Sequence, residues 1–179
     1  MKIYAVRHAQ ADHNVRWRLN DDPAQPSDLT SKGRLQAQAI AQVLAPVKFD
    51  AIYTSALPRT NQTAAIINGS RGVPVVVENR LNEVRTGFGG QPTWRWLLAQ
   101  LLTGFKTSKR HKDGETLDEA RIRIEQWLTE LKQRPYQSVL IVAHQHTIQT
   151  LSSILSGISY AKALKRPIRH TQVMEYELV

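Results

Sequence analysis

Short β-type runs alternate along this chain with segments of helical periodicity. Residues 138–143 form a continuous apolar run, which is typical of a strand covered on both faces. Residues 2–6, 51–54 and 73–77 are predicted as further strands, and each is rich in β-branched or aromatic residues. This alternation favours an α/β fold, a three-layer α/β/α sandwich with a mostly parallel sheet.

Capping residues and apolar spacing predict the intervening helices. Thr30 is a candidate N-cap, and Pro46 would end the helix that follows it. Pro58 is suited to a first helical turn, while Thr116 and Glu119 fit a capping box. Apolar stripes predict the buried faces of three helices: Leu35, Ala39, Ile40, Val43 and Leu44; Leu117, Ala120, Ile124, Trp127, Leu128 and Leu131; and Ile148, Leu151 and Leu155. The tail, residues 171–179, is predicted to be an edge strand.

Residues 84–114 interrupt this regular order. Gly87, Gly89, Gly90, Pro92 and Gly104 punctuate the segment, which we expect to be an inserted lid with one helix. The rest of the chain shows no repeat or linker that would divide it. With 179 residues, of which 41% are hydrophobic, residues 1–179 are predicted to form a single domain.

Composition narrows the chemistry and the partners. The chain has no cysteine, so thiolate catalysis and thiolate metal sites are excluded. Lysine plus arginine exceed acidic residues by nine (24 minus 15), which favours an anionic partner. Residues 1–6 are too short an apolar stretch for a signal peptide or a spanning helix, so we expect a cytoplasmic protein without a membrane partner.

Two histidines and two arginines fall at the predicted carboxyl ends of strands. Arg7 and His8 follow the first strand, Arg59 lies just beyond the second, and His144 follows the apolar run. Ligands of such folds bind outside these strand ends, so the four side chains are expected to meet. Guanidinium groups suit a phosphate dianion, and a neutral imidazole is a competent nucleophile. This pattern predicts phosphate chemistry without a metal or cofactor.

Several ordered segments resemble one known family, the histidine phosphatase superfamily (phosphoglycerate mutase-like, branch 1). Arg7-His8-Ala9 resembles its Arg-His-Gly/Ala signature, and Asn14 stands where many members carry an asparagine. The other matching segments are residues 29–37, 55–64, 81–83, 114–116 and 142–144. One departure is Gln145, where family members usually have glycine after the second histidine.

The resemblance implies a fold, a mechanism and a set of residues. The fold would be phosphoglycerate mutase-like. His8 would attack phosphorus, His144 would assist, and Glu83 would protonate the leaving oxygen before activating water. Arg7, Asn14 and Arg59 would bind the phosphate. The implied protein is a phosphatase of the histidine acid phosphatase type, acting on a small, anionic phosphorylated substrate without a metal.

Four alternatives remain open. The shared chemistry would also fit a phosphoglycerate mutase-type phosphotransferase or a protein phosphohistidine phosphatase. Arg16-Trp17-Arg18 and Trp94-Arg95-Trp96 could belong to a nucleic-acid-binding module, but we favour tryptophans that pack the lid against the domain. His144 and His146 could bind a metal with Asp12 and His13, although the nearby arginines would repel a cation.

Overall fold

A five-stranded sheet lies at the centre of the computed structural model, which describes residues 1–104 and 106–179. In spatial order its strands are β3 (Val75–Val77), β2 (Ala51–Thr54), β4 (Ser138–Ala143), β1 (Lys2–Arg7) and β5 (Val173–Glu177). The first four run parallel, and β5 is antiparallel to β1. The predicted mostly parallel sheet and the edge position of the tail are confirmed.

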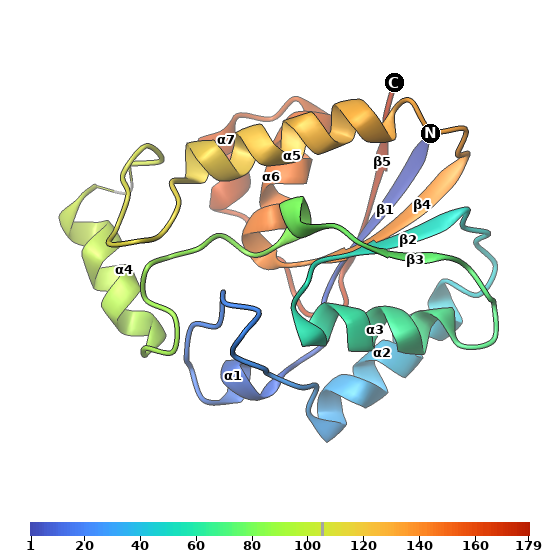
Figure 1. Ribbon diagram of the computed structural model, residues 1–179, viewed down its shortest axis with the longest axis horizontal. Coiled ribbons are helices and arrows are strands. Elements are labelled where there is room, and N and C mark those ends of the chain that lie inside the picture. The colour runs from blue at the N-terminus through green and yellow to red at the C-terminus, as the bar shows by residue number, and fades with distance from the viewer. Residues whose placement is uncertain (105) are drawn as a thin grey trace.

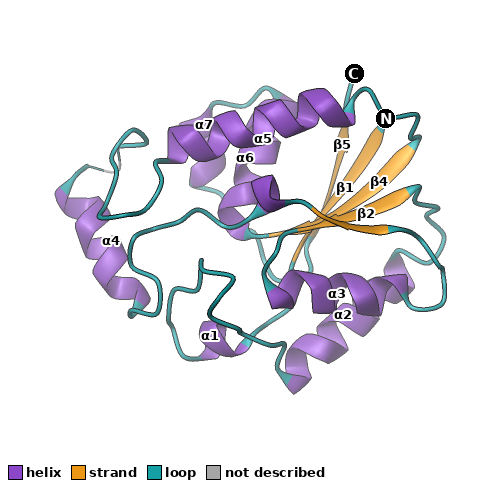
Figure 2. Cartoon of the chain, in the orientation of Figure 1, coloured by secondary structure: helices purple, strands orange, loops and turns teal. Residues whose placement is uncertain are grey.

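Helices cover both faces of this sheet (Figure 1 and Figure 2). On one side lie α2 (Ser31–Val43) and α3 (Pro58–Asn68); on the other lie α5 (Leu117–Leu131), α6 (Gln145–Ser156) and α7 (Tyr160–Leu164). Beyond the carboxyl ends of the strands are α1 (Asp12–Val15), the 3-10 turn η1 (Asn79–Leu81) and the lid helix α4 (Thr93–Leu102). The three layers are as predicted, whereas the short helices α1 and α7 were not.

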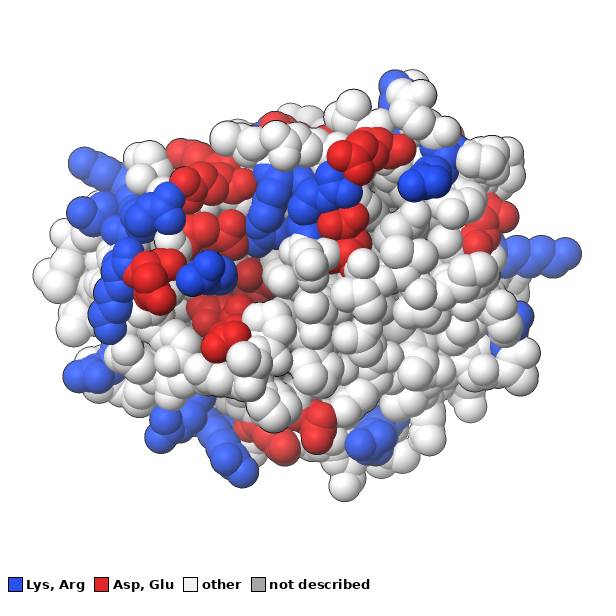
Figure 3. All heavy atoms as spheres, in the orientation of Figure 1, with Lys and Arg blue, Asp and Glu red and all other residues white. Residues whose placement is uncertain are grey.

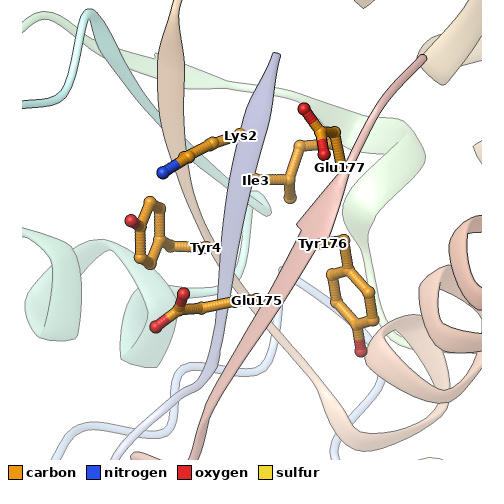
Figure 4. A pocket seen from close by; sticks show the side chains of 6 residues that line it. All are labelled: Lys2, Ile3, Tyr4, Glu175, Tyr176 and Glu177. Carbon is orange, nitrogen blue, oxygen red and sulfur yellow. The ribbon is translucent and has the colours of Figure 1, made fainter.

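Side chains of the central strands alternate between two cores. Ile3 and Ala5 of β1 pack with residues of α5 and α6, whereas Val6 packs with residues of α3. At the edge, Ile3 pairs with Tyr176 and Tyr4 with Glu175, so each pair points to one face (Figure 4). Burial on both faces explains why β4 has an unbroken apolar run.

The buried face of α2 matches the predicted stripe only in part. Leu44 is buried and Ile40 packs against the core. Leu35 and Val43, however, are 66% and 67% exposed, while the small residues Gly33 and Ala37 are buried. The cause is a close approach to the loop that follows β1. A Cβ added at Gly33 would lie 2.0 Å from the carbonyl oxygen of Gln10. This contact holds α2 directly against the loop that begins with His8.

The lid contains the expected single helix within its described residues. None of the helices in the described ranges has the length and apolar character needed to cross a membrane.

The predicted capping box of α5 is present. Glu119 N–H donates to Thr116 Oγ1 at 3.0 Å, and Thr116 N–H donates to Glu119 Oε2 at 2.8 Å. This reciprocal pair fixes where the lid ends and α5 begins.

We predict that Thr116→Ala lowers the free energy of unfolding by about 1 kcal/mol, because it leaves an amide at the start of α5 without its acceptor. Urea denaturation followed by circular dichroism would measure the change. The matched control is Thr129→Ala on the exposed side of the same helix, expected to stay within about 0.5 kcal/mol. Equal losses in the two variants would contradict the capping role.

Candidate functional site

His8 follows β1 directly and is buried. Its Nδ1 lies 2.8 Å from the carbonyl oxygen of Ala9, so this nitrogen carries the proton and donates it. Nε2 is then the unprotonated nitrogen, and it accepts a hydrogen bond from Nε–H of Arg59 at 3.1 Å. Burial first, and then the positive charge of Arg59, lowers the pKa of His8 well below the ordinary histidine value. The imidazole is therefore neutral at neutral pH, with its lone pair on Nε2.

Arg59 lies in the first turn of α3 and is almost completely buried. Besides His8, its guanidinium donates to Asn20 Oδ1 at 2.6 Å, to the Asn20 carbonyl at 2.9 Å and to His144 Nδ1 at 3.1 Å. Within the described ranges it forms no salt bridge to a carboxylate. Burial lowers its pKa to about 10, so the side chain remains charged at neutral pH. The site thus holds a buried cation without a directly paired anion.

His144 directly follows β4, occupies the N-cap position of α6 and is hydrogen-bonded to this guanidinium. Because its Nδ1 accepts from Arg59, its proton lies on Nε2, which is 2.8 Å from Ser55 Oγ. The rings of His8 and His144 are 5.2 Å apart. Burial, together with the charge of Arg59, lowers the pKa of His144 well below the ordinary value. Both imidazoles are therefore held neutral in fixed tautomers.

Arg7 is the last residue of β1. Its Nη1 donates to Gln145 Oε1 at 3.0 Å and to the Ile168 carbonyl at 2.5 Å. Its Nε is buried and has no hydrogen-bond partner among the described residues. The side chain of Gln145, which departs from the family pattern, is therefore a partner of Arg7 at the cavity wall.

Glu83 follows the 3-10 turn η1 by two residues and lines the cavity. Its Oε1 accepts a hydrogen bond from Val84 N–H at 3.0 Å and lies 3.4 Å from His146 Nδ1. Burial alone would raise the pKa of Glu83, but His146 and the Val84 N–H outweigh it and lower the pKa below the usual range. The carboxylate is therefore ionised in the free site.

One cavity of about 250 Å³ brings most of the predicted residues together. Of the six, Arg7, His8, Asn14, Arg59 and Glu83 line it, and His144 lies behind them, bound to Arg59. Asn14 is oriented by the Ala11 N–H, which donates to its Oδ1 at 2.9 Å. Two cationic side chains, an imidazole with an unprotonated nitrogen and a carboxylate thus converge on one space.

Three contributors lie outside the six predicted catalytic and phosphate-binding residues, and of these only His13 was considered before, as a metal ligand. The rings of His13 and His170 lie 5.8 and 5.4 Å from that of His8, and Nδ1 of His170 donates to the His8 carbonyl at 3.0 Å. Oδ1 of Asn20 accepts a hydrogen bond from Nη1 of Arg59. His170 precedes the edge strand β5, whose start lies beside the carboxyl end of β1. The position of His170 just before β5 therefore indicates a site residue only once the antiparallel pairing of β5 with β1 is known.

The lid covers one side of this cavity through α4. Thr93, Trp96 and Leu97 line the cavity, and the Trp96 ring lies 5.5 Å from that of His146. The prediction that the tryptophans pack the lid is therefore confirmed for Trp96. It is wrong for Trp17 and Trp94, which are exposed.

The alternative of a metal site finds no supporting arrangement. Over the ranges 1–104 and 106–179, no group of three or more His, Asp or Glu side chains is placed to hold an ion. Both ring nitrogens of His144 already have partners in Ser55 and Arg59. His146 faces Glu83 instead of a second histidine.

Comparison with known proteins agrees with this geometry. The sequence model of the histidine phosphatase superfamily (branch 1) matches residues 3–178. The chain belongs to this superfamily. A relative named "Putative phosphoserine phosphatase 2", from Hydrogenobacter thermophilus, is 33% identical over 88% of this chain and 79% of its own length. "Probable phosphoglycerate mutase GpmB" from an Enterobacter species is 28% identical over 90% and 78%.

Solved structures show the same superfamily fold. The alpha-ribazole phosphatase from Shigella flexneri superposes with a TM-score of 0.85 at 25% identity, covering 98% of this chain and 89% of its own. The phosphoglycerate mutase-like architecture is thereby confirmed. Superfamily members named above include both phosphatases and a mutase, so phosphatase activity is supported at the level of the superfamily.

We predict that phosphate stabilises the folded protein strongly, because an anion would neutralise the buried charge of Arg59. At a phosphate concentration 100-fold above Kd, the gain is about 2.7 kcal/mol, which differential scanning calorimetry would record as a higher Tm. Arg59→Met should remove most of this shift. Arg71→Met is the matched control, since Arg71 binds the carbonyls of Val47 and Ala41 away from the cavity. An unchanged phosphate-induced shift in Arg59→Met would refute the assignment.

Proposed function

We propose that this chain is a metal-independent phosphomonoesterase that works through a phosphohistidine on His8. The observation that carries the proposal is the fixed tautomer of His8, which leaves Nε2 unprotonated and hydrogen-bonded to the Arg59 guanidinium in a ring that lines the cavity. Residues 1–179 act as a single histidine phosphatase domain, and the substrate is a small anionic phosphate ester.

In the first step, Nε2 of His8 attacks phosphorus and the ester P–O bond breaks. Arg7 and Arg59 bind the non-bridging oxygens, with Asn14 at the cavity wall, and Arg59 shifts its hydrogen bond from Nε2 to the phosphoryl group. His144 keeps the guanidinium in place through its Nδ1. The nucleophile needs no prior loss of a proton, because burial already keeps the pKa of His8 low.

Glu83 supplies and then takes back one proton. The free site holds this carboxylate ionised, and the negative charge of an arriving phosphate favours its uptake of one proton from solvent. That proton goes to the leaving oxygen. In the second step Glu83 accepts a proton from water, the hydroxide attacks phosphorus, and the P–N bond breaks to restore neutral His8.

The same phosphoenzyme could return its phosphoryl group to a bound phosphoglycerate instead of water. The Enterobacter relative carries the name of that activity, and it is 28% identical to this chain. Interconversion of 2- and 3-phosphoglycerate without phosphate release would identify a mutase. Release of inorganic phosphate from simple esters would identify the hydrolase.

We predict that His8→Ala lowers kcat for p-nitrophenyl phosphate by about a thousandfold or more, because it removes the attacking nitrogen. Wild-type turnover should persist in excess chelator. Rapid quenching with radiolabelled substrate should trap an acid-labile, base-stable label on the peptide that contains His8. His111→Ala is the matched histidine control, and it should retain wild-type activity. Full activity in His8→Ala, or loss with chelator, would overturn the mechanism.

The role of Glu83 predicts a dependence on the leaving group. Alkyl phosphates need a proton on the departing oxygen, whereas p-nitrophenolate leaves without one. Glu83→Gln should therefore lower kcat/KM about a hundredfold or more for an alkyl phosphate and much less for p-nitrophenyl phosphate. Steady-state kinetics with both substrates would measure the ratio. Equal losses for the two would show that Glu83 only shapes the cavity.

A further inference from the structure

Two residues of the lid helix α4, Trp96 and Leu97, line the cavity, and Leu97 is also 47% exposed. Beside them, Trp94, Leu98, Leu101 and Leu102 are exposed by 60%, 47%, 65% and 77%. Their spacing of four, seven and eight residues from Trp94 places them on one side of a helix. A single exposed leucine needs no explanation, but this continuous apolar ridge does.

A second exposed tryptophan, Trp17, lies near the amino-terminal end of α4. Thr93 N–H and Oγ1 both donate to the carbonyl of Trp17, at 2.9 and 3.0 Å, so Trp17 is fixed beside Trp94 in the backbone. The Trp17 side chain is 77% exposed, and its φ of 52° holds the residue in the left-handed region. Such a conformation is unfavourable for a bulky residue unless the surrounding contacts impose it. The hydrogen bonds from Thr93 therefore hold Trp17 in place while its indole is exposed to solvent.

Basic residues are frequent in the segment that carries this ridge. From residue 84 to residue 112 the sequence has no aspartate or glutamate, and it has six basic residues: Arg85, Arg95, Lys106, Lys109, Arg110 and Lys112. Arg85 and Arg110 form salt bridges with Asp113 and Glu119, whereas Arg95, Lys106 and Lys109 are exposed. Figure 3 shows Lys and Arg side chains toward the end of the molecule where α4 lies, with Asp and Glu side chains among them. The exposed cations Arg95, Lys106 and Lys109 form a basic rim beside the apolar ridge.

We propose that this ridge and its rim, the outer lid surface, dock onto an anionic phospholipid bilayer with α4 lying parallel to the membrane. Leucines would enter the boundary of the hydrocarbon, the indoles would lie at the headgroup level, and the cations would contact lipid phosphates. The helix, about 15 Å long, lies on the surface and does not span it. The expectation of no membrane partner considered only spanning segments and signal peptides, which surface docking does not need.

Charge and shape argue against two other occupants. A second copy would bring one basic rim against another, on chains that each carry a formal net charge of +9. Single-stranded nucleic acid would match the charge and could stack on Trp17 and Trp94. However, it gains little from three exposed leucines, which offer no aromatic face. Phospholipid is the partner that uses the leucines, the tryptophans and the cations together.

Flotation of the intact protein with large unilamellar vesicles would test this proposal. We expect binding to phosphatidylcholine vesicles containing about 30% phosphatidylglycerol, little binding to pure phosphatidylcholine, and weakening as salt is raised above 0.1 M, where screening is short-ranged (about 10 Å). Leu98→Gln/Leu101→Gln should lower the partition coefficient about tenfold or more. These residues do not line the cavity, so hydrolysis of p-nitrophenyl phosphate in buffer should report that the variant is folded.

Two control variants separate this surface from general stickiness and from catalysis. Leu35→Gln/Ile122→Gln removes two other exposed apolar side chains, on α2 and α5, and should bind vesicles like wild type. His8→Ala should also bind like wild type, so a failure of the proposed phosphatase activity would leave this result unaffected. Lys106→Gln/Lys109→Gln should weaken binding to the anionic vesicles.

Three outcomes would overturn the proposal. One is the absence of flotation with anionic vesicles at 0.1 M salt. Another is flotation that the Leu98→Gln/Leu101→Gln variant leaves unchanged. The third is a different occupant: light scattering that shows a wild-type dimer made monomeric by this variant, or oligonucleotide binding that this variant abolishes while vesicle binding persists.

Discussion

The buried guanidinium of Arg59 is the group around which the site is built. It reaches four acceptors on three separate segments, namely the His8 ring, the side chain and carbonyl of Asn20, and the His144 ring. Transferring such a charge out of water is costly, and no paired carboxylate offsets that cost within the described structure. The neutral imidazoles and the amide oxygens do so only in part. Part of the positive charge of Arg59 therefore remains uncompensated. A phosphate group would supply the missing negative charge.

This arrangement also explains why both histidines stay neutral. A protonated ring at position 8 or 144 could not accept a hydrogen bond from Arg59 and would face its charge at close range. The site therefore fixes tautomers through hydrogen bonds to Ala9 and Ser55, and it gains a nucleophile without a general base. Stability and reactivity here depend on the same few contacts.

The sequence allowed the sheet and most of the site to be predicted because parallel strands bring their carboxyl ends to one edge. That rule places Arg7, His8, Arg59 and His144 together from the sequence alone. It could not find His170, because this residue lies beside an antiparallel edge strand. Periodicity in the sequence does not reveal which strand that edge strand pairs with. It also missed Asn20, whose position depends on the path of a loop. The predicted stripe on α2 was right for Ile40 and Leu44 but wrong for Leu35 and Val43, because the close approach at Gly33 turns the other side of the helix inward.

The two ends of the chain lie side by side at the far pole of the sheet from the cavity (Figure 1). The amino group of Met1 donates to the Leu178 carbonyl at 3.0 Å, and β1 and β5 run antiparallel between them and the site. A fused reporter or a surface anchor at either end would therefore leave the cavity unobstructed. A short peptide joining the ends would bridge little distance, so a circularly permuted chain opened in an exposed loop could keep the same sheet.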